Sequence, residues 1–229
     1  MRGWLPAVAV SSVALLGLAQ PSQASLMLSL SDGASTQTLS DTANTGVLSF
    51  FGSIGSFALN FTSGSSKPAT GSATDPQLDL ISVNVTAFSG GTLSIALSDV
   101  GFVGTSGLTS FMDAVSGFES AGALAVNTYM DCGNAAFAET TQLTAQSFNT
   151  ATISGNASKT VNTCTGSYSL TQVALLSMPA FAVSGFTSNL SDPPSGSGSV
   201  PEPATATLFA GALLGWLGFD WMRRRQRAI

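Results

Sequence analysis

The sequence contains no histidine, and this absence limits the chemistry that the chain could perform. Ser–His–Asp and Cys–His mechanisms both need an imidazole, so neither is available. Carboxylate pairs remain, because Asp75 and Asp79 flank Pro76, and Asp113 lies close in sequence to Glu119. Two carboxylates about 5–10 Å apart could hydrolyse a glycoside. A chain with this many acids offers such pairs by chance, so we expect that it is not an enzyme.

Acidic residues far outnumber basic ones in the middle of the chain. Ten acids and only two bases, Lys67 and Lys159, lie between Ser25 and Ser199. Nucleic acid is therefore not an expected partner, because phosphate binding needs a basic surface. The acids could attract a divalent cation, with Asp75, Asp79 or Asp99 as candidate calcium ligands, or they could simply keep a secreted surface soluble. No calcium-binding motif accompanies them, and we expect no cofactor.

The amino terminus has the features of an export signal. A basic start precedes an apolar run over residues 4–19, and Ser22 and Ala24 are the small residues that signal peptidase accepts. We expect residues 1–24 to form a signal helix that is cleaved between Ala24 and Ser25. The alternative is a retained anchor, but the run is short for a membrane span of about 20 residues.

Export would place the two cysteines, Cys132 and Cys164, in an oxidising compartment. An even pair in a secreted domain usually forms a disulfide. A metal pair or a catalytic thiol is the alternative, but a metal site would need more soft ligands. The sequence therefore predicts a Cys132–Cys164 disulfide.

The carboxyl terminus combines three consecutive features. Residues 191–199 form a Pro, Gly and Ser linker, and residues 204–222 form an apolar segment that as a helix would span about 28 Å, close to the hydrocarbon thickness. Between them lies Val200-Pro201-Glu202-Pro203, and after the span come Arg223, Arg224, Arg225 and Arg227. The positive-inside rule would hold that basic cluster in the cytoplasm. From these features alone, the tail is a single transmembrane helix after a linker.

The order of these parts closely resembles the PEP-CTERM sorting signal, and the resemblance is confined to residues 200–229. It implies a Gram-negative host with an exosortase, a membrane enzyme thought to act near the Pro-Glu-Pro motif of residues 201–203. It also implies delivery from an inner-membrane intermediate to the cell surface or to an extracellular polysaccharide matrix. The expected partners are signal peptidase, the exosortase and the membrane, with an exopolysaccharide matrix as a further candidate. The alternative is a permanent anchor with a chance proline-rich junction.

Residues 25–190 have the pattern of an all-β domain. Apolar residues alternate with polar ones over short runs, as in Leu93, Ile95 and Leu97, and clusters of Gly, Ser, Asn and Pro separate the runs. Strands of this length with such turns predict an antiparallel β-sandwich resembling a jelly roll. A one-residue step in the alternation between Leu80 and Ile81 predicts a β-bulge.

Two further features of this region are less clear. The one helical pattern covers residues 106–120, with Leu108, Phe111, Met112 and Val115 on one face, but a loop fits equally well because Gly117 interrupts it. Sugar-binding modules often expose aromatic residues on a flat face. The domain has no Trp. Its candidate aromatic residues fit a core better than an exposed face, and they are Phe50, Phe51, Phe57 and Phe61.

Three classes of function remain for this domain. We favour a structural protein of the cell surface or extracellular matrix, which the low charge and many Ser and Thr residues suit. The alternative is a carbohydrate- or calcium-binding surface module, which exposed aromatic residues or converging carboxylates would support. A hydrolase would need a cleft that holds two carboxylates with perturbed pKa values.

The sorting interpretation predicts a host-dependent change in mass. In a host with a functional exosortase, the protein should lose the residues after about Pro203 and leave the inner membrane, because the tail is the part that the enzyme processes. In the same host without the enzyme, the tail should stay intact. Mass spectrometry of cell fractions measures both forms. An intact tail in the inner membrane of both hosts would contradict the interpretation.

Overall fold

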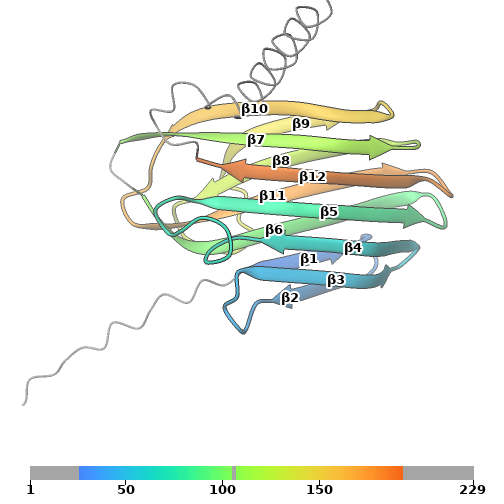
Figure 1. Ribbon diagram of the computed structural model, residues 1–229, viewed down its shortest axis with the longest axis horizontal. Helices are drawn as coiled ribbons and strands as arrows, with labels where there is room; N and C mark the ends of the chain where they lie inside the picture. The colour runs from blue at the N-terminus through green and yellow to red at the C-terminus, as the bar shows by residue number, and fades with distance from the viewer. Residues whose placement is uncertain (1–25, 105–106, 193–229) are drawn as a thin grey trace, which may run out of the picture.

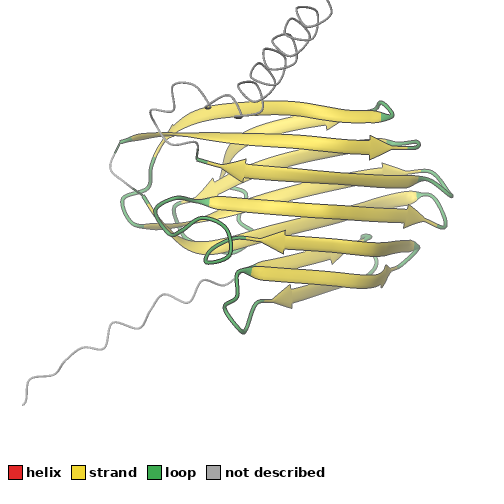
Figure 2. Ribbon diagram, viewed as in Figure 1, coloured by secondary structure: helices red, strands yellow, loops and turns green. Residues whose placement is uncertain are grey.

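The described part of the chain is a stack of two β-sheets. A computed structural model describes residues 26–104 and 107–192, and all regular elements in these ranges are strands (Figures 1 and 2). The strands form two six-stranded sheets in which all neighbours pair antiparallel. The predicted all-β sandwich is therefore confirmed.

Each sheet draws its strands from the whole length of the domain. In spatial order, sheet A contains β2 (Thr36–Ser40), β1 (Met27–Ser31), β6 (Gly91–Val103), β11 (Ser167–Met178), β8 (Ala123–Asp131) and β9 (Thr141–Phe148). In spatial order, sheet B contains β10 (Thr152–Asn162), β7 (Leu108–Glu119), β12 (Val183–Ser191), β5 (Gln77–Ala87), β4 (Phe57–Ser65) and β3 (Val47–Ile54). The chain crosses repeatedly between the two sheets from β5 to β12, while β1–β2 and β3–β4 extend the sheets at one edge (Figure 1).

The strand alternation read from the sequence sets which side chains enter the core. Leu93, Ile95 and Leu97 of β6 are fully buried, and Leu124 and Val126 of β8 lie in the same layer. Because successive side chains point to opposite faces of a strand, the residues between them face outward. Burial of these apolar faces between the sheets is the main force that holds the sandwich together.

One polar cluster interrupts this apolar core. The Asp113 carboxylate of β7 is fully buried and accepts hydrogen bonds from Ser188 Oγ at 2.8 Å, Gln146 Nε2 at 2.8 Å and Gln172 Nε2 at 3.3 Å. Thr144 Oγ1 donates a longer bond at 3.4 Å. Burial raises the pKa of Asp113, and these donors partly offset the rise. The cluster links β7 and β12 of sheet B to β9 and β11 of sheet A.

The predicted bulge in β5 is confirmed. Two β5 residues, Ile81 and Ser82, lie opposite the single residue Thr187 of β12. Ser82 has a φ of 53°, in the left-handed region. Both residues are exposed, whereas apolar residues on either side of them return to the core.

The expectation for residues 106–120 was wrong, and the expectation that the phenylalanines lie in the core was wrong for Phe51. The helix candidate is strand β7, because pairing with β10 and β12 on both sides satisfies its backbone and overrides the short helical pattern. Phe51 is 79% exposed on edge strand β3 rather than part of the core, whereas Phe50 and Phe57 are buried.

Several predictions fall on residues that the structure does not describe. The signal peptide, most of the linker, the Pro-Glu-Pro motif, the apolar span and the arginine cluster lie outside residues 26–192. The last strand extends through Ser191, so the sandwich ends one residue later than the composition suggested. In the ranges 26–104 and 107–192, no helix is long and apolar enough to cross a membrane.

The predicted disulfide is also present. Cys132, after β8, is bonded to Cys164, before β11, across a sequence separation of 32 residues. Such a bridge restricts the unfolded chain. It therefore stabilises the folded domain, and it lies at the end of the sandwich at which β8 ends and β11 begins.

Replacing both cysteines with serine should lower the free energy of unfolding by about 3–4 kcal/mol, because the unfolded chain regains the entropy of a loop of this length. Urea denaturation followed by circular dichroism measures the change. Equal unfolding free energies for the double variant and the oxidised protein would contradict this role of the bridge.

Candidate functional site

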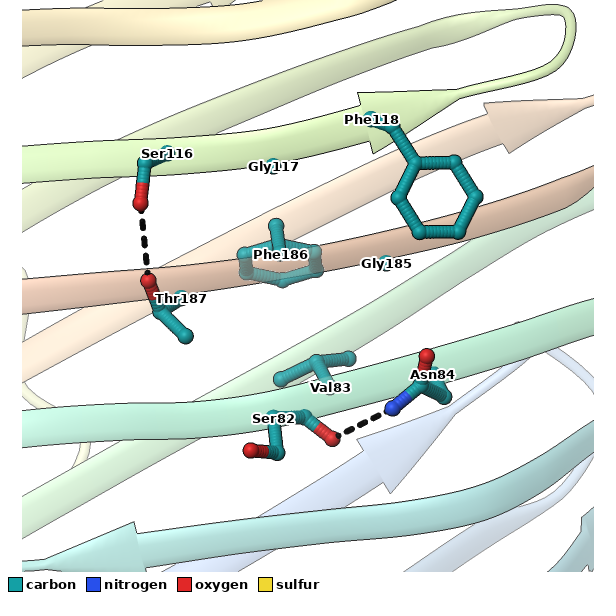
Figure 3. A pocket seen from close by; sticks show the side chains of 9 residues that line it. All are labelled: Ser82, Val83, Asn84, Ser116, Gly117, Phe118, Gly185, Phe186 and Thr187. Atoms are coloured by element: carbon teal, nitrogen blue, oxygen red, sulfur yellow. Dashed lines mark hydrogen bonds between the residues drawn. The ribbon is translucent and has the colours of Figure 1, made fainter.

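A shallow groove crosses the outer face of sheet B, over the centre of the sheet (Figure 3). It has a volume of about 250 Å³ and is open to solvent. Three neighbouring strands line it, namely β7, β12 and β5. The lining residues are Ser82, Val83, Asn84, Ser116, Gly117, Phe118, Gly185, Phe186 and Thr187.

The groove depends on two glycines that lie diagonally across from each other on neighbouring strands. Gly117 of β7 pairs with Phe186 of β12, and Gly185 pairs with Phe118. A Cβ atom on Gly185 would lie 2.6 Å from the Phe118 ring, so only a glycine lets the ring lie over β12 at this point. Phe186 itself is 2% exposed and packs in the core, which leaves mainly backbone at the floor of the groove.

One aromatic ring borders this floor. The Phe118 side chain is 50% exposed although it is large and apolar. Figure 3 shows the ring beside Gly185, on the same side of the sheet as Asn84. A ring held in this way offers a flat apolar face to a ligand in the groove.

Neutral hydrogen-bonding groups lie beside the ring. Ser116 and Thr187 join their hydroxyls at 3.0 Å, and Asn84 Nδ2 donates to Ser82 O at 3.1 Å (Figure 3). Each hydroxyl can donate and accept, and the Asn84 amide carries two donor hydrogens and an acceptor. No lining residue is charged. The arrangement suits a neutral ligand with many hydroxyl groups and one apolar face.

The polar face continues along β12 and β5 beyond the groove. Asn189 lies two residues after Thr187 and pairs with Asp79 of β5. Asn189 Nδ2 donates a hydrogen bond to Asp79 Oδ1. Burial raises the pKa of Asp79 to about 6, and the Asn189 hydrogen bond partly offsets this rise.

Apolar side chains continue the surface in the other direction. Val183, on β12, is 37% exposed, and Phe181 and Phe88 in nearby turns are 81% and 60% exposed. The two turns lie close together, because the Phe181 N–H donates a hydrogen bond to the carbonyl of Ala87, the residue before Phe88, at 2.7 Å. The end of the sandwich at which β12 begins therefore exposes several apolar side chains.

Among the carboxylates singled out in the sequence, Asp99, Asp113 and Glu119 are buried. Asp113 and Glu119 both point into the core, where Asp113 is held by neutral donors and Glu119 is 3% exposed with a pKa raised by burial. Asp99 forms an ion pair with Lys67. No three acidic or cysteine side chains of the described ranges converge as a metal site would require.

The groove residues were missed by sequence reasoning. Phe118 and Gly117 lie in the segment with helical spacing, which Gly117 interrupts. The strand alternation was visible in Phe111, Asp113 and Val115, and it would have placed Phe118 on the opposite, outer face. A phenylalanine on the solvent side of a strand, next to a glycine, is the signal that could have revealed the site.

Comparisons with known proteins identify no family for this chain. No protein family and no curated protein sequence matches it. Among solved structures, TmCBM61 in complex with β-1,4-galactotriose is similar at 14% identity over 48% of this chain and 71% of that chain, with a TM-score of 0.29. The enzymatically active domain of tailspike protein 4 of bacteriophage CBA120 matches at 11% identity over 57% of this chain and 18% of that chain, with a TM-score of 0.31. The C-terminal CBM6 of LamC from Zobellia galactanivorans matches at 12% identity over 65% and 90% of the two chains, with a TM-score of 0.20.

The raised pKa of Asp79 predicts a pH-dependent stability. Its folded value of about 6 exceeds the unfolded value of 3.8, so the folded protein binds the proton more tightly. Stability from this group is fully present below about pH 4 and is lost as the pH rises through about 6. Asp79→Asn keeps an oxygen acceptor for Asn189 and removes the titration. The variant should therefore gain stability relative to the parent as the pH rises across this window.

Urea denaturation of both proteins at a series of pH values measures this difference. Other buried carboxyls contribute equally to both proteins and cancel. A difference in unfolding free energy that stays constant across the window would show that Asp79 is not the group responsible.

Proposed function

We propose that the chain is an exported cell-surface protein whose sandwich binds a neutral carbohydrate in the groove on sheet B. The observation that carries this proposal is the half-exposed Phe118 ring over the floor at Gly185, with Ser, Thr and Asn side chains beside it. The carbohydrate-binding alternative thus accounts for the site better than a purely structural role does.

The chemistry of the groove fits a sugar ring. A pyranose has an apolar face of C–H groups that can stack on an aromatic ring, and its edge carries hydroxyls that pair with small polar side chains. The groove is open and shallow, whereas sites for small ligands usually enclose most of the ligand. An open groove suits a segment of a long polysaccharide, which can enter and leave at both ends.

The charges favour a neutral polysaccharide over an anionic one. Lys67 and Lys159 are the two basic residues of the described ranges, and neither lines the groove. Lys67 is buried in an ion pair, and Lys159 donates to the Gln142 carbonyl of β9. An acidic polymer would meet no cation there and would be repelled by the acidic surface.

The sorting tail would present this groove outward. Strand β12 ends at the left of Figure 1, whereas Phe118 and Gly185 lie towards the opposite ends of their strands, where β7 finishes and β12 begins. Signal peptidase would remove residues 1–24, and the tail at residues 200–229 would hold the protein for exosortase processing. The proposed product is a non-catalytic, jelly-roll-like module that joins the cell surface to its polysaccharide matrix.

Replacing Phe118 with alanine should weaken polysaccharide binding about tenfold, because it removes a stacking contact of about 1.4 kcal/mol. Affinity electrophoresis through gels that contain β-1,4-galactan, dextran, laminarin or the host's own extracellular polysaccharide measures the effect. In whichever gel retards the parent protein, Phe118→Ala should be retarded less than the parent.

Phe51→Ala is the matched control, since Phe51 is also an exposed phenylalanine of sheet B but lies on edge strand β3 outside the groove. It should leave binding unchanged. If none of the four gels retards the parent protein, the proposed function is overturned. If Phe118→Ala and Phe51→Ala weaken binding equally, the carbohydrate site does not lie in the groove.

A further inference from the structure

A buried lysine and a buried aspartate meet at the end of the sandwich where β6 finishes. Lys67 lies in the connection between β4 and β5, and its Nζ atom lies 2.8 Å from Asp99 Oδ2 of β6. The Lys67 side chain is 8% exposed and the Asp99 side chain 0% exposed. The contact joins a loop between two strands of sheet B to a strand of sheet A.

The surroundings of the pair are poor in charge. The Nζ atom lies 3.7 Å from the centroid of the Phe102 ring, and Phe102 packs against Tyr168 with a centroid separation of 5.7 Å. The Val100 backbone makes two further polar contacts, since its carbonyl accepts from Nζ at 2.6 Å and its N–H donates to Asp99 Oδ1 at 2.8 Å. Burial lowers the pKa of Lys67, which favours the neutral amine.

We propose that Lys67 and Asp99 condense to an intramolecular amide, so that a covalent isopeptide bond joins the two sheets of the mature protein. The two reacting side chains are already in contact, and both are shielded from water. The Val100 N–H and carbonyl hold them in place through hydrogen bonds. Such fixed reactants have effective concentrations of about 10⁵–10⁸ M, which favours an intramolecular condensation.

The atoms and charges of this step balance without a further reactant. One proton passes from the Lys67 ammonium to the Asp99 carboxylate, which gives an amine and a carboxylic acid. The Nζ lone pair then forms a bond to Cγ, and the negative charge that develops on Oδ1 is held by the Val100 N–H. The Cγ–Oδ2 bond breaks, and Oδ2 leaves as water with two of the three ammonium protons.

The product removes a cost that the ion pair carries. Burying two charges costs desolvation free energy, and their Coulombic attraction offsets only part of that cost. The amide is neutral, and its oxygen can keep the Val100 N–H donor. The bond would lie at the same end of the sandwich as the Cys132–Cys164 disulfide, because Gly104, after β6, lies against Cys164.

Peptide mapping of the full-length protein tests this proposal. After reduction, chymotrypsin should release residues 62–78 and 98–102 by cleavage beside Phe61, Leu78, Leu97 and Phe102. We expect these two segments as a single branched species that is lighter by one water molecule than their sum, with fragment ions that locate the link at Lys67 and Asp99. Recovery of both segments only as separate, unmodified peptides from folded protein would overturn the proposal.

Lys67→Arg is the matched variant, because arginine keeps the positive charge beside Asp99 but offers no amine that can form this bond. It should abolish the branched species and slow the reduced, denatured chain in gel electrophoresis, since an internally linked chain stays more compact. Lys159→Arg should change neither result. A branched species that persists in Lys67→Arg would place the link at other residues and contradict the assignment.

Discussion

The placement of one buried carboxylate constrains the whole sandwich. Asp113 lies between the sheets and accepts hydrogen bonds from Ser188 of its own sheet and from Gln146 and Gln172 of the opposite sheet. A buried carboxylate without such donors would cost several kcal/mol. The strands β7, β12, β9 and β11 must therefore meet in the one arrangement that brings these donors together, whereas apolar contacts alone would tolerate small shifts.

The strand register that Asp113 requires also determines which side chains lie on the outer face of sheet B. Because a strand alternates its faces, fixing Asp113 and Ser188 inward also fixes Ser116, Phe118 and Thr187 outward. The pairing of β7 with β12 then sets Gly117 and Gly185 on adjacent strands, and the ring of Phe118 fills the space beside Gly185. The groove is thus a consequence of the core register, and a one-residue slip of β7 would remove it.

The sequence predicted what depends on local pattern. The alternation at Leu93, Ile95 and Leu97, the bulge after Leu80 and the pairing of the cysteines all follow from spacing or from the composition of the chain. For β7 the sequence carried two competing patterns, a strand alternation and a short helical spacing, and pairing with distant strands decides between them. Local pattern could have placed Phe118 on the outer face, but the full groove and the Lys67–Asp99 contact each bring together residues from separate strands or loops, which spacing along the chain does not predict.

Carbohydrate binding on the outer face of sheet B, as proposed above, can be tested by residue-resolved mapping of a bound sugar. Amide signals of isotope-labelled protein would be followed during titration with oligosaccharides from β-1,4-galactan, dextran, laminarin and the host's own polysaccharide. We expect saturable shifts centred on Gly117, Phe118 and Gly185. Shifts confined to sheet A, or none with any of these sugars, would contradict it.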